Sequence, residues 1–83
     1  PVQSGTDAAE TLTGGAGADL LLAYGGNDSL SGAEGADILE GWAGGDTLDG
    51  GGDDDTLDGG DAADSLQGGN GNDSLRGQAA NDT

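Results

Sequence analysis

Acidic side chains recur at intervals of nine residues along this chain of 83 residues. They are Glu10, Asp19, Asp28, Asp37, Asp46, Asp55, Asp64, Asp73 and Asp82. Carboxylate oxygens are ligands for hard divalent cations, and the chain has no His or Cys to hold zinc, copper or an iron cluster. The spacing therefore indicates binding of a metal ion by oxygen ligands alone, which means calcium or magnesium.

The overall charge excludes several other functions. Seventeen carboxylates face one basic side chain, Arg76, and the formal net charge is −16. Nucleic acids and anionic membrane surfaces both require clustered Lys or Arg, so we expect neither as a partner. The longest apolar stretch, residues 20–24, is far too short to span a membrane. Because the chain starts at Pro1 without Met or a signal sequence, we expect it to be a fragment of a larger protein.

The acidic positions belong to a repeat of nine residues that starts at Gly5. The acidic residue is sixth in each block, and the eighth residue is leucine in every complete block, from Leu12 to Leu75. The first residue is Gly except at Ala23, and the ninth block is truncated at Thr83. A strict period of this kind is typical of a solenoid. We therefore predict one repeat domain over residues 5–83, preceded by a leader or linker at 1–4.

The column pattern predicts how each block folds. Glycines early in a block favour a tight turn, and the last residues of the block alternate as in a strand with leucine facing inward. Each block reverses the chain once, so two blocks should form one coil of 18 residues. Strands of odd blocks should then form one parallel sheet and strands of even blocks another. The predicted fold class is thus all-β, with the leucines of two short parallel sheets meeting in the core.

Stacked coils would place the sixth-position carboxylates in rows of like charge, which a divalent ion would relieve. A flexible turn rich in carbonyl groups suits the six to eight ligands of Ca²⁺ better than the strict octahedron of Mg²⁺. With ions between the turns of blocks n and n+2, the two edges hold about seven Ca²⁺. The first-position glycines are predicted to contribute to these sites alongside the carboxylates. They are Gly14, Gly32, Gly41, Gly50, Gly59 and Gly68.

Two blocks, GGAGADLLL at 14–22 and GGNGNDSLR at 68–76, fit the pattern GGxGxDxUx at every specified position. The chain thus resembles the RTX family of calcium-binding repeats over residues 5–83. The resemblance implies a right-handed parallel β-roll in a secreted bacterial protein, exported by a type I system, that folds on meeting external calcium. It also implies that the sixth-position aspartates from Asp19 to Asp73 bridge neighbouring ions while turn carbonyls complete the ligand shell.

Some blocks depart from the family pattern. Glu10 replaces Asp in the first block, and Asp53 or alanine replaces the fourth-position glycine in others. The alanines are Ala8, Ala62 and Ala80. We expect weaker binding at these turns. The acidic residues outside the sixth position are interpreted mainly as solubility charges, with Asp53 and Asp54 as further possible ligands.

Tyr24 and Trp42 occupy the second position of blocks three and five, so the coil places them in contact. We interpret them as a packing pair that shields a turn, in preference to a platform for a ligand. Leu20, Leu22 and Ile38 fall at outward positions of even blocks and predict a small apolar patch.

Two roles remain open at this point. The first is a calcium-binding module without catalytic activity, which supports folding and secretion of a larger parent protein outside the cell. The second is a structural or adhesive array at the cell surface, in which coils associate end to end or along their edges.

Overall fold

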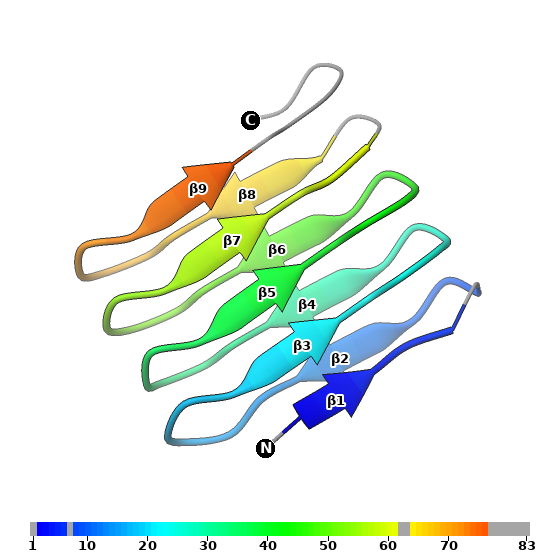
Figure 1. The fold of residues 1–83 in the computed structure, drawn as a ribbon. Coiled ribbons are helices and arrows are strands. Elements are labelled where there is room, and N and C mark those ends of the chain that lie inside the picture. Colours follow the sequence, from blue (N-terminus) through cyan, green and yellow to red (C-terminus); the bar gives the residue numbers. More distant parts are fainter. Residues whose placement is uncertain (1, 7, 62–63, 77–83) are drawn as a thin grey trace.

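The computed structural model describes residues 2–6, 8–61 and 64–76, which form short strands joined by turns (Figure 1). Each strand is three residues long and occupies the seventh to ninth positions of its repeat, with leucine in the middle from β2 onward. No helix occurs within these ranges, so the described residues include no helix that is long and apolar enough to cross a membrane. The prediction of an all-β fold is confirmed.

The strands form two parallel sheets. The five-stranded sheet consists of β1 (Val2–Ser4), β3 (Leu20–Leu22), β5 (Ile38–Glu40), β7 (Thr56–Asp58) and β9 (Ser74–Arg76). The four-stranded sheet consists of β2 (Thr11–Thr13), β4 (Ser29–Ser31), β6 (Thr47–Asp49) and β8 (Ser65–Gln67). Paired residues such as Leu21 and Leu39 are two repeats apart, which confirms the coil of 18 residues and the separation of odd from even blocks. Figure 1 shows the two sheets one behind the other.

The first strand corrects one prediction. Residues 1–4 were expected to be a leader outside the repeats, but Val2–Ser4 forms β1 and pairs with β3. Gln3 stands nine residues before Leu12, at the position where the complete blocks have leucine. The nine-residue period therefore extends one strand further back, and glutamine in place of leucine obscures it in the sequence. The ladder uses backbone groups and so tolerates this change. The Gln3 amide instead donates a hydrogen bond to the Thr13 carbonyl at 2.6 Å.

The core is a double column of leucines between the sheets. Leu21, Leu30, Leu39, Leu48 and Leu57 are at most 1 % exposed, and Leu66 is also buried. The two outer leucines of the series differ from the prediction of a uniform core. Leu12 is only partly buried and Leu75 is 45 % exposed, because a residue in an outer described coil has a neighbouring coil on one side only.

Candidate metal centre

The sixth-position carboxylates lie just before the strands, so stacking arranges them in two columns, one at each edge of the roll. One column contains Asp19, Asp37, Asp55 and Asp73, and the other contains Glu10, Asp28, Asp46 and Asp64. From Asp19 to Asp64 these side chains are only 1 to 4 % exposed. Six carboxylates are therefore buried inside the turns rather than solvated. Asp82 lies outside the described residues.

Each column is held by hydrogen bonds from coil to coil. The backbone N–H of Asp37 donates to Oδ1 of Asp55 at 2.7 Å, and that of Asp28 donates to Oδ1 of Asp46 at 2.7 Å. The same bond recurs at the other steps of both described columns, at 2.6 to 2.8 Å. One oxygen of each accepting carboxylate is thus occupied, and the side chain has a defined orientation.

The second oxygen of several of these carboxylates is buried without a hydrogen-bond donor. This holds for Oδ2 of Asp28, Asp37, Asp46 and Asp55. Burying a charged acceptor without a partner is costly, and a bound cation would remove that cost. These oxygens are the structural feature that fits a metal ion most directly.

Glycine at the first position makes room beside three of these oxygens, those of Asp37, Asp46 and Asp55, whereas the block of Asp28 begins with the buried Ala23. A Cβ atom on Gly41 would lie 2.5 Å from Oδ2 of Asp46 and 2.8 Å from the carbonyl oxygen of Gly59 in the next coil. Gly32 has the same relation to Asp37 and to the carbonyl of Gly50. The carboxylate lies equally close at the remaining predicted glycines, Gly14, Gly50, Gly59 and Gly68. At these glycines, carboxylate and, where the next coil supplies it, carbonyl oxygens therefore meet in a space that a Cβ atom would fill.

The carboxylate and carbonyl oxygens at the turns form a mixed ligand set of the kind that calcium accepts, and they are not a compact cluster of carboxylates. Within the described ranges, no three acidic side chains come together closely enough to hold one metal ion. An ion in the turns must therefore draw on one or two carboxylates and on several carbonyl groups. Calcium accepts such a mixed shell, whereas Mg²⁺ prefers to keep its waters.

Glu10 lies beside Gly5 as the aspartates lie beside their glycines, but it is longer and less buried than they are. Its carboxylate accepts hydrogen bonds from the Thr6 N–H at 2.6 Å and from the Thr6 hydroxyl at 2.9 Å. The longer side chain is only half-buried and is engaged by its own turn. Weaker ion binding by the first block stays a prediction.

The structure gives three side chains outside the sixth position a role that the sequence did not indicate. Oδ2 of Asp53 accepts the N–H of Gly35 at 2.8 Å, and Oδ1 of Asp54 accepts that of Asn72 at 2.7 Å. Asn27 accepts the N–H of Gly45 at 2.8 Å in the same way. Each bond joins residues 18 positions apart, so these side chains tie successive turns together. The spacing of 18 residues between donor and acceptor, which is the length of one coil, is the sequence feature that could have identified these side chains.

Burial changes the ionisation of the carboxylates. It raises the pKa of Asp46 to about 7, and the neighbouring charges of Asp64 and Asp28 act in the same direction. Burial also raises the pKa of Asp37 and of Asp55. The metal-free roll therefore holds protons that an unfolded chain, with ordinary aspartate pKa values near 3.8, would release.

A dependence of stability on pH follows for the metal-free chain. Because the folded pKa of Asp46 lies above the unfolded value, the ionised carboxylate destabilises the fold increasingly as pH rises from about 4 to about 7. We expect more β-sheet circular dichroism at pH 5.5 than at pH 8 in EDTA, and a smaller difference in Asp46→Asn. Repeating both measurements in 0.5 M NaCl screens the surface charges but not the buried ones. Equal signals at both pH values would contradict the expectation.

Comparison with known proteins agrees with this geometry. The sequence model of the RTX calcium-binding nonapeptide repeat matches the chain in four copies, over residues 4–39, 22–57, 32–66 and 58–83. Together the copies extend over nearly the whole chain. Neither the curated proteins nor the solved structures gave a significant match.

Proposed function

We propose, since this chain belongs to the family of RTX calcium-binding nonapeptide repeats, that its roll folds when external Ca²⁺ fills the turns and thereby supports the secretion of a larger protein. Calcium binding itself is the property that the family shares, and proteins of this family are typically secreted. Folding after export, an extracellular location and support for a parent protein's secretion are the further properties that we propose for this chain.

One observation carries the proposal: buried carboxylate oxygens without a donor face the glycine turns at both edges of the roll. In a chain with a formal charge of −16, their stabilisation has to come from a cation outside the sequence. Extracellular calcium modules bind with dissociation constants of roughly 10⁻⁴ to 10⁻³ M. Sites of that affinity would remain empty inside a cell and fill after export.

In this role the module acts as a folding element and performs no reaction. Its ligands are calcium ions, and its partner is the remainder of the parent protein. The secreted chain would leave the cell unfolded, because the buried charges oppose the roll until calcium is available. Folding outside would then favour the exported state.

Calorimetric titration with Ca²⁺ and with Mg²⁺ tests the binding on which the proposal depends. We expect Ca²⁺ to bind with a large heat and Mg²⁺ to give little. Asp46→Asn should weaken the adjacent sites by about tenfold or more, since calcium affinity depends on the charge of the ligands. Asp49→Asn is the matched control, because Asp49 is exposed on the outer face of β6 and lies outside the columns.

Equal loss of affinity in both variants would mean that the overall charge attracts the ion and that the columns are not the site. Sedimentation velocity of the same samples separates the two roles that the sequence left open. A monomer in calcium supports a module within one parent protein. Calcium-dependent particles that grow with protein concentration would instead support an array of stacked coils.

A further inference from the structure

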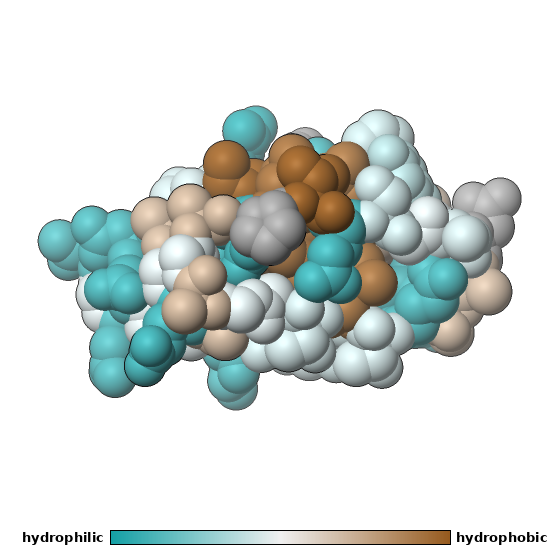
Figure 2. Space-filling view, turned by 90° about the horizontal axis from the view of Figure 1, so that it is seen from below, coloured by the Kyte–Doolittle hydropathy of each residue, from teal (hydrophilic) through white to brown (hydrophobic). Residues whose placement is uncertain are grey.

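Three exposed large hydrophobic side chains, Val2, Ile38 and Trp42, lie at outward positions of the five-stranded sheet or in the turn that follows it. Strand alternation points the seventh and ninth positions outward, and the first position of the next block then leads into the turn. The predicted patch lies at these outward positions: Leu20 pairs with Ile38, which is 45 % exposed, and Leu22 is half-buried beside them. Figure 2 shows the roll from the end where β1 lies, with hydrophobic residues gathered on one side. The outward positions of the four-stranded sheet are Thr, Ser, Asp and Gln instead.

Tyr24 and Trp42 lie at the second position of their blocks, in the turns that follow β3 and β5. Their rings meet edge to face, with centroids 4.9 Å apart and planes at 65°, which confirms the predicted contact. The column then ends, because the next residue in it is Gly60. Without a side chain beyond it in the column, Trp42 remains 49 % exposed.

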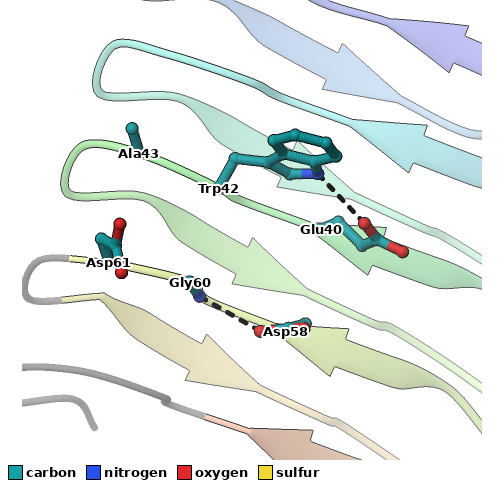
Figure 3. A pocket seen from close by; sticks show the side chains of 6 residues that line it. All are labelled: Glu40, Trp42, Ala43, Asp58, Gly60 and Asp61. Carbon is teal, nitrogen blue, oxygen red and sulfur yellow. Dashed lines mark hydrogen bonds between the residues drawn. The ribbon is translucent and has the colours of Figure 1, made fainter.

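The missing side chain leaves an open pocket of about 320 Å³ beside the indole. We call it the Trp42 pocket, and it is lined by Glu40, Trp42, Ala43, Asp58, Gly60 and Asp61 (Figure 3). The indole N–H donates to Oε1 of Glu40 at 3.0 Å, which holds the ring against the carboxylate. The backbone N–H of Asp61 donates to the Trp42 carbonyl at 2.9 Å and ties the two walls together.

The lining combines an aromatic wall with three carboxylates and no base. Arg76 is the chain's single basic residue. It lies in β9, where it is the strand-register partner of Asp58 in β7, and it does not line the pocket. The three carboxylates do not come close enough together to hold one metal ion. Their arrangement around an aromatic ring suits an extended organic cation, which stacks on the ring while its N–H groups reach separate carboxylates.

We propose that the Trp42 pocket binds the guanidinium group of an arginine side chain from a partner protein. Guanidinium is planar, weakly hydrated and forked, so it can stack on an indole and donate to two carboxylates at once, whereas the lysine ammonium is a compact, strongly hydrated charge. The apolar patch on the same sheet face offers contacts for residues that flank the arginine.

The test uses the calcium-loaded chain and the blocked peptide acetyl-Leu-Arg-Leu-amide. Trp42 is the sole tryptophan, so its fluorescence reports on the pocket directly. We expect a saturable change with the arginine peptide. Affinity should fall by about tenfold when citrulline, which has the same shape without the charge, replaces arginine, and by about threefold with lysine.

Two variants in the pocket and one control variant make the test decisive. Glu40→Gln should lower the affinity for the arginine peptide by about fivefold, while the new amide oxygen can still accept the indole N–H. Asp61→Asn removes a second negative charge from the pocket. Asp49→Asn removes the same charge from the opposite sheet and should leave affinity within about twofold. Circular dichroism in calcium checks that each variant is folded. Equal affinity for the arginine and citrulline peptides, or equal loss in all three variants, would overturn the proposal. Trp42, Ala43, Gly60 and Asp61 belong to turns that lead to the carboxylate columns, so a calcium titration of each variant separates loss of the pocket from loss of the ion.

Discussion

Chelating calcium with EDTA at pH 7.5 should remove most of the β-sheet circular dichroism of this chain, and added Ca²⁺ should restore it in a steep transition. The reason lies in the two carboxylate columns. Each buried oxygen without a donor costs on the order of 1 to 3 kcal/mol. Four such oxygens, at Asp28, Asp37, Asp46 and Asp55, amount to a cost comparable with the roughly 5 to 15 kcal/mol that stabilises a whole small domain.

The transition should be cooperative because neighbouring coils share the columns. The carboxylate of Asp46 accepts the backbone N–H of Asp28 in one coil, and the backbone N–H of Asp46 donates to Oδ1 of Asp64 in another. An ion that orders one turn therefore helps to order the next, as expected of a solenoid with nearest-neighbour coupling. The experiment is a calcium titration followed by far-ultraviolet circular dichroism, with Mg²⁺ at the same concentrations as the control. Persistent β-sheet signal in EDTA would mean that the backbone ladders and the leucine core suffice without the ion.

The second large effect is expected from alanine at a turn glycine. Gly35 has φ +96°, and a Cβ atom there would overlap the carbonyl oxygen of Gly17 in the preceding coil. Gly17 has φ +91°, but a Cβ atom at that position would meet nothing within 4 Å. The two residues thus share the strained backbone conformation and differ in the space around them.

We expect Gly17→Ala to lower the free energy of unfolding by about 1 to 2 kcal/mol, the cost of a left-handed conformation for an L-residue. Gly35→Ala should lower it by about 2 to 5 kcal/mol, because the overlap with the neighbouring coil adds about 1 to 3 kcal/mol. Urea unfolding in saturating calcium measures both. Equal losses would show that backbone strain, and not the close approach of the turns, determines the need for glycine.

Much of the fold was predictable because the period is written along the chain at every block. Glycine, carboxylate and leucine columns each specify a local conformation or an inward orientation, and two blocks of nine specify the coil of 18. The structure confirms the two parallel sheets and their register on these grounds. The closeness of sixth-position aspartates to first-position glycines was predictable on the same grounds, whereas their binding of Ca²⁺ stays a prediction.

What the sequence could not determine is how one coil meets the next. The strand at Val2–Ser4, the donor-free oxygens and the bonds from Asp53, Asp54 and Asn27 all depend on residues one coil away. The Trp42 pocket likewise exists because Gly60, 18 residues later, supplies no side chain to cover the indole. A nine-residue pattern describes the average block, so it determines the architecture of the roll. The particular neighbour that each side chain meets is decided only when the coils stack, because those contacts join residues that no local pattern relates.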